Sequence, residues 1–73
     1  MDKTYIVIEL QTNSNGTIGS LTYSFADINT AENKYHTILA AAAVSNLPCH
    51  AAVMIQNDGL ILKADRYYHN TEE

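Results

Sequence analysis

The chain has little of what usually stabilises a small protein. Its 73 residues include one cysteine, one proline and no tryptophan. The single cysteine, Cys49, excludes an intramolecular disulfide and a zinc site built on paired cysteines. A core of this size rarely supplies more than about 3–5 kcal/mol of stability, and oligomerisation is a common remedy. The composition therefore predicts a chain that associates with itself.

Basic residues and long apolar runs are scarce as well. Four Lys and Arg residues stand against eight Asp and Glu, and the formal net charge is −4 at pH 7. The basic residues are scattered along the chain, which disfavours a nucleic-acid surface. No apolar run approaches the roughly 18 residues that span a membrane, and the first residues carry no signal-peptide pattern. We therefore expect a cytoplasmic protein with neither nucleic acid nor membrane as a partner.

Hydrophobic periodicity predicts an α+β domain with the element order β-β-α-β-β. Segments 4–11 and 50–56 are apolar at both alternating sets of positions, as inner strands are. Segments 21–26 and 60–65 are apolar at one set only, as edge strands are. We therefore predict a four-stranded antiparallel sheet in the order 2-1-3-4, with the helix packed on one face.

The connections are predicted from turn-forming residues. An Asp-Gly pair within 57–59 indicates a tight hairpin, whereas 12–19 is a longer turn-forming cluster. We expect one domain over residues 1–73, with 69–73 as a frayed tail.

The predicted helix covers about residues 30–45, with Asn29 as its N-cap and Glu32 as the reciprocal capping residue. Four consecutive alanines, 40–43, sweep the whole helix circumference at ~100° per residue. One side should rest on the sheet, and the opposite apolar side then needs a second chain. The predicted oligomer interface joins the outer helix side to the uncovered sheet face: Asn33, His36, Thr37, Ala40, Ala43 and Val44 on the helix, and Tyr5, Val7, Ala52 and Met54 on the sheet.

Residues able to bind a metal or act as nucleophiles form no recognisable set. Their spacing matches no known zinc site; they are His36, His50, His69, Cys49 and Asp65. Cys49 and His50 are adjacent on a predicted strand, so their side chains should point to opposite faces and cannot act as a nucleophile–base pair. We therefore predict no metal site, no cofactor and no catalytic residues, which means that the protein is not an enzyme.

Three segments give the chain a resemblance to a family of small proteins from gut-type Firmicutes and their phages or prophages. They are TYIVIELQTN at 4–13, AENKYHTILAAAAVS at 31–45 and HAAV at 50–53. The resemblance spans most of residues 4–62, is most specific in KYHTILAAAAVS, and carries over no functional residue. It implies a context in which small proteins inhibit host proteins or sequester host signals, usually without catalysis.

Two functions fit these observations. The first is a non-enzymatic homo-oligomer, a dimer or higher, that binds a host macromolecule. The second is a protein that sequesters a nucleotide-like signal in pockets between subunits. Its candidate ligand-binding residues are Lys34, Tyr35 and His36, with loop 12–19 beside them. A solvent-exposed helical histidine is an equally good interpretation of His36.

Overall fold

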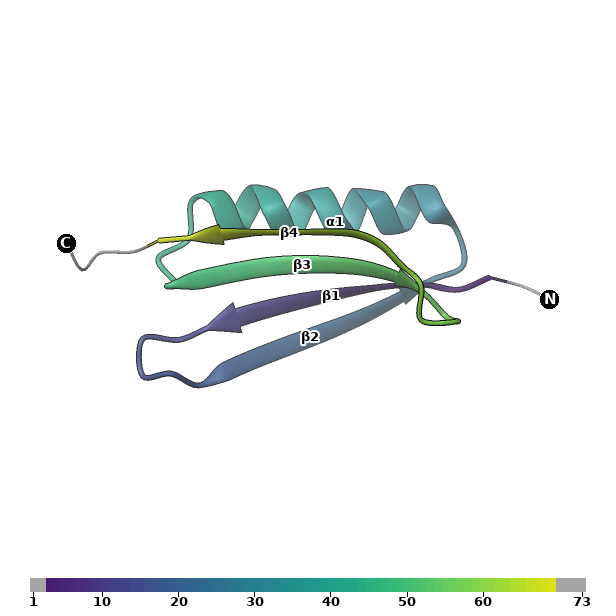
Figure 1. Ribbon diagram of the computed structural model, residues 1–73. Helices are drawn as coiled ribbons and strands as arrows, with labels where there is room; N and C mark the ends of the chain where they lie inside the picture. The colour runs from purple at the N-terminus through teal and green to yellow at the C-terminus, as the bar shows by residue number, and fades with distance from the viewer. Residues whose placement is uncertain (1–2, 70–73) are drawn as a thin grey trace.

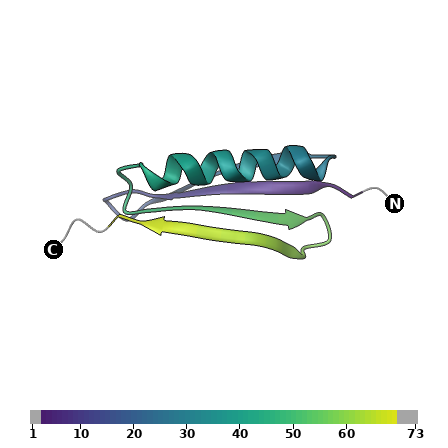
Figure 2. The ribbon, with the colours of Figure 1, turned by 90° about the horizontal axis from the view of Figure 1, so that it is seen from above.

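The computed structural model describes residues 3–69 and has the predicted element order. The elements are β1 (Tyr5–Thr12), β2 (Ile18–Phe25), α1 (Ile28–Ala43), β3 (Cys49–Gln56) and β4 (Ile61–Tyr68). The strands form an antiparallel sheet in the order β2-β1-β3-β4, and α1 lies along one face of it (Figures 1 and 2). The α+β class, the strand order and the helix on one face are therefore confirmed.

Two turns close the hairpins, and both use a glycine with positive φ. The β1–β2 loop is shorter than the predicted 12–19, because the Asn13 N–H donates to the Thr17 carbonyl at 2.8 Å. Between β3 and β4, the Gly59 N–H donates to the Gln56 carbonyl at 2.9 Å, with a Gly59 φ of 93°. This is a turn followed by a left-handed glycine, as the Asp-Gly signal predicts.

The helix begins two residues earlier than predicted. Asp27, and not Asn29, is the N-cap: its carboxylate accepts from the Thr30 backbone N–H at 2.9 Å and from the Thr30 hydroxyl at 3.0 Å. A carboxylate satisfies a free N–H there and also interacts favourably with the positive end of the helix dipole. At the other end, the Val44 N–H donates to the Ala41 carbonyl at 3.2 Å.

The covered sheet face is the opposite of the predicted one. Tyr5, Val7, Ala52 and Met54 point toward α1, and the last three are fully buried. The core cluster consists of Val7, Ala31, Tyr35, Ile38, Ala52 and Met54.

The pairing of β2 with β1 explains this correction. In β2, the large apolar side chains after the first residue occur at alternate positions and so point to one face of the sheet only. Two of these residues, Tyr23 and Phe25, pack against the core. They pair with Val7 and Tyr5, and directly paired residues point to the same face. Burying the apolar set of β2 therefore turns the Tyr5–Val7 set of β1 toward the helix, and Tyr5, Val7, Ala52 and Met54 cannot form an exposed interface.

Candidate functional site

The sheet face turned away from α1 is mainly aliphatic on its two central strands. Pairing across the sheet places three β1–β3 couples on this face: Ile6 with Ile55, Ile8 with Val53, and Leu10 with Ala51. Strand β4 extends the row with Ile61, opposite Ile55, and Ala64, opposite Val53, and then adds a charged and an aromatic side chain, Arg66, opposite Ala51, and Tyr68, opposite Cys49. Strand β2 adds three small hydroxyl side chains, Ser20, Thr22 and Ser24. We call this surface the open face.

The open face is large enough to form an interface between proteins. Four strands of eight residues, at ~3.4 Å per residue and ~4.8 Å between strands, cover about 500 Å² in projection. Two such faces in contact would bury about 1,000 Å², the lower limit for a specific protein–protein interface. Exposed apolar patches of several hundred Å² often mark binding sites. Ile61, at 63% exposed, shows how accessible part of this surface is.

The outer side of the helix is exposed as predicted. Its six predicted interface residues are all exposed: Asn33, His36, Thr37, Ala40, Ala43 and Val44. Val44, at 81% exposed, is the most accessible large apolar side chain at this end of the helix. The Thr37 hydroxyl donates to the Asn33 carbonyl at 2.7 Å and is therefore partly satisfied within the helix. Whether this side binds a second chain stays a prediction.

The three predicted ligand-binding residues do not converge. The Lys34 ammonium lies 4.1 Å from the centre of the Tyr23 ring, on the β2 side of the sheet. Tyr35 is buried in the core, and its burial, together with the negative charge of Asp65, raises the pKa of its phenol. His36 is exposed and meets the Tyr35 ring edge to face, with 5.4 Å between ring centres.

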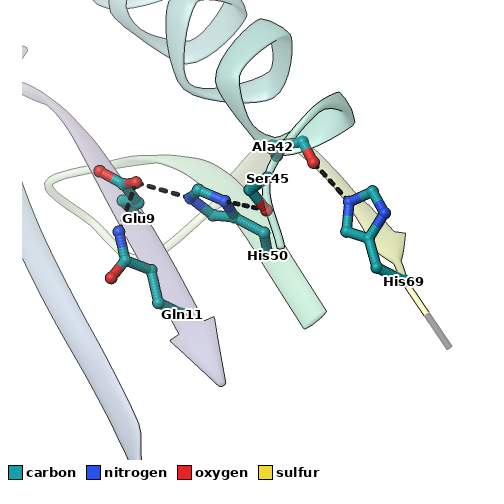
Figure 3. A network of polar contacts seen from close by, with 6 residues as sticks. All are labelled: Glu9, Gln11, Ala42, Ser45, His50 and His69. Carbon is teal, nitrogen blue, oxygen red and sulfur yellow. Dashed lines mark hydrogen bonds and ion pairs between the residues drawn. The ribbon is translucent and has the colours of Figure 1, made fainter. Parts of the chain in front are cut away.

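A buried polar network lies under the C-terminal end of the helix (Figure 3). The His50 Nε2 is 2.6 Å from a Glu9 carboxylate oxygen, and the Gln11 amide donates to the same oxygen at 2.8 Å. The other ring nitrogen, Nδ1, is 3.1 Å from the Ser45 hydroxyl. The side chains of His50 and Glu9 are only 5% and 13% exposed.

The environment of Glu9 favours its ionised form. Burial alone raises the pKa of Glu9, but hydrogen bonds from His50 and Gln11 and charge interactions with His50 and Lys34 bring it below its ordinary value. The network therefore contains a carboxylate at neutral pH. It joins β1, β3 and the segment that follows the helix, because its members come from all three.

The hydroxyl–imidazole–carboxylate chain looks like the relay of a serine hydrolase, but its surroundings do not suit one. Catalysis by Ser45 would need donors aimed at a developing oxyanion. Ser45 instead follows the helix C-terminus, where its own N–H donates to the Ala42 carbonyl at 3.3 Å. The partial negative charge of a helix C-terminus stabilises cations and repels anions. The arrangement suits a structural His–Glu pair.

The last described residue also binds the helix end. The His69 Nε2 lies 2.6 Å from the Ala42 carbonyl, and the His69 N–H donates to the Pro48 carbonyl at 2.9 Å. Residue 69 is therefore ordered by these contacts, which corrects the expectation of a frayed tail there, and 70–73 lie outside the described residues. Within 3–69, no three or more His, Cys, Asp or Glu side chains gather to hold a metal ion.

The Glu9–His50 contact was not predicted from the sequence. One signal for it exists: Glu9 follows the apolar residues Tyr5 and Val7 on the side of β1 that faces the helix. A buried carboxylate requires a hydrogen-bonding partner, and His50, whose ring nitrogens can supply one, lies near the start of β3. The adjacent Cys49 lies on the open face, so the prediction that Cys49 and His50 point to opposite faces is confirmed.

The chain matches no protein-family model, no curated protein and no solved structure. The resemblance to the Firmicutes and phage family therefore stays a prediction. In the part of the chain from residue 3 to residue 69, no helix combines the length and apolarity needed to cross a bilayer.

Proposed function

We propose that this protein is a small, non-enzymatic homo-oligomer that acts by binding another macromolecule, a host protein in the phage context implied by its resemblance. The observation that carries the proposal is the open face, which presents Ile6, Ile8, Leu10, Val53 and Ile55 on the two central strands. We infer that two copies stack through this face.

Stacking removes from water the remaining exposed surface of apolar side chains that are half-buried in one copy of the chain. Full burial of an exposed Ile or Val side chain is worth roughly 1.5–3 kcal/mol, and each half-buried side chain gains only part of this on stacking. Two aligned sheets pack about 10 Å apart with interdigitated side chains. The helices then lie on the outside of the pair, because α1 covers the opposite face of each sheet. The outer side of α1 thus stays accessible and is the surface that we assign to the partner macromolecule.

Light scattering after size-exclusion chromatography tests the assembly. Val53→Lys places a charge at the centre of the open face and should lower the molar mass, while far-UV circular dichroism stays unchanged. Ile8→Lys, on the neighbouring strand, should have the same effect. The matched control is Ala43→Lys on the exposed outer side of α1, which should leave the mass unchanged.

Two outcomes would contradict the proposal. A wild-type protein that is monomeric near 8.1 kDa at micromolar concentration has no such interface. A mass lowered by Ala43→Lys but not by Val53→Lys would assign assembly to the helix instead.

The alternative function, sequestering a nucleotide-like signal, stays a prediction with less support from the geometry. Of its three candidate residues, Tyr35 is buried and Lys34 is held over Tyr23. A thermal-shift screen with nucleotides tests it, because a ligand at ~100 times its dissociation constant should stabilise the fold by ~2.7 kcal/mol.

A further inference from the structure

The two edges of the sheet are protected very differently. Edge strands expose unpaired N–H and C=O groups, and proteins usually guard them with charges, proline or bulges. Strand β4 carries Lys63, Asp65 and Arg66, and its pairing with β3 is interrupted by a register shift. Strand β2, with the sequence IGSLTYSF, contains no charged residue and no proline over its eight residues. Ile18 and Leu21 on it are 69% and 50% exposed.

A glycine on β2 has no explanation within one copy of the chain. Gly19 lies in regular pairing with Gln11, and its φ is not in the left-handed region. A Cβ added at Gly19 would meet no atom within 4 Å. Glycine weakens a strand, and its presence there often marks the close approach of another backbone. The position points to a neighbour on the β2 side.

We propose that β2 pairs antiparallel with β2 of a second copy, about a two-fold axis through Thr22. This axis is perpendicular to the sheet, so the two four-stranded sheets become one continuous sheet with both helices on the same side. A two-fold contact between identical edges stops at two copies, because it leaves neither β2 edge free to pair with a third copy.

The sequence of β2 is complementary to itself in this register. Ser20 lies opposite the partner's Ser24, Leu21 opposite the partner's Tyr23, and Gly19 opposite the partner's Phe25. Residues on the helix side thereby meet residues on the helix side, which antiparallel pairing requires. An aromatic ring across from an edge glycine is a stabilising pair, and it gives Gly19 a role. No pair places like charges together.

The inference rests on self-association in the proposed function but uses a different surface. Edge pairing joins the open faces of two copies into one surface of twice the area. Stacking two such surfaces gives a closed tetramer, in which the edge contact and the face contact are separable.

Cysteine cross-linking tests the register in a Cys49→Ser background. Thr22→Cys should form a disulfide-linked dimer under mild oxidation, because directly opposed residues have Cβ atoms ~4.5–5.5 Å apart. Ser20→Cys and Ser24→Cys should each fail alone, since each would sit about 14 Å from its own copy at ~3.4 Å per residue. The double variant carrying both should cross-link. Asp65→Cys on the β4 edge is the matched control and should not.

The same series is repeated with Val53→Lys, which removes the face contact. A Thr22→Cys dimer that persists there supports edge pairing independently of stacking. Absence of the Thr22→Cys dimer, or equal cross-linking of Asp65→Cys, would overturn the inference while leaving the face contact untouched. Conversely, a mass unaffected by Val53→Lys together with efficient Thr22→Cys cross-linking would overturn face stacking alone.

Discussion

Replacing Glu9 by Gln should destabilise the protein by about 2 kcal/mol at neutral pH. The carboxylate accepts two short hydrogen bonds, at 2.6 Å from His50 and 2.8 Å from Gln11, in a site where its side chain is 13% exposed. A hydrogen bond to a charged group is worth about 1.5–3 kcal/mol. Gln keeps the shape and one acceptor, so the loss reflects mainly the missing charge. In a domain of this size, 1 kcal/mol shifts Tm by roughly 4–8 °C, which predicts a fall in Tm of about 10 °C.

The pH dependence of this difference follows from the direction of the pKa shift. The pKa of Glu9 is lower in the folded state than its ordinary value, so its ionisation stabilises the fold above the unfolded pKa of about 4.3. That contribution is lost as the pH falls through the folded pKa, where Glu9 becomes protonated. Wild type and Glu9→Gln should therefore differ at pH 7 and converge as the pH falls below the folded pKa of Glu9, where both carry a neutral side chain.

Thermal unfolding followed by circular dichroism, at one fixed protein concentration, measures both effects. The matched control is Glu32→Gln, because Glu32 forms an exposed pair with Lys63 at 3.4 Å. Exposed pairs contribute about 0–1 kcal/mol, so this control should change Tm little. An equal loss from both substitutions, or a Glu9→Gln difference that persists in acid, would refute the structural role given to the His50–Glu9 pair.

Two further substitutions test the helix start and the direction of the core. Asp27→Ala should cost about 1 kcal/mol of unfolding free energy through loss of the N-cap, while Asn29→Ala should be nearly neutral; the reverse order in urea melts would restore the cap to Asn29. Met54→Ala should cost about 2–5 kcal/mol because it leaves a cavity under α1. Ile55→Ala, on the open face, should instead mainly lower the molar mass of the assembly. A larger loss of stability from Ile55→Ala than from Met54→Ala would indicate that the helix covers the Ile55 face of the sheet and not the Met54 face.

The strand order could be predicted because inner and edge strands differ in pattern. Segment 21–26 has one apolar set and segment 4–11 has two, which places the first at an edge and the second inside. The covered face could not be read from β1, because Ile6 and Ile8 are as apolar as Tyr5 and Val7. The informative strand was β2: its single apolar set has odd numbers and pairs with the odd residues of β1.

The buried network and the helix start were beyond sequence reasoning for different reasons. Glu9 and His50 are 41 residues apart, and they meet only because of the β1–β3 register. The helix start lay among several capping residues in the segment ADINT, and the point at which the chain leaves β2 decides among them. The preferences of single residues identify the possible N-caps, and tertiary contacts determine which of them begins the helix.

The position of β1 between β2 and β3 constrains the order of folding. The β1–β2 and β3–β4 hairpins join segments close in sequence, whereas the β1–β3 seam brings Tyr5 to Gln56 across the whole helix. Closing that long loop costs entropy before its contacts repay it, which slows folding. We expect the amides of both hairpins to gain protection together in pulsed hydrogen exchange, when β1 pairs with β3, because neither hairpin is stable alone. Until β1 pairs with β3, β1 has a neighbouring strand on one side only. Each half of the sheet is then an isolated hairpin, which is too small to be stable in water.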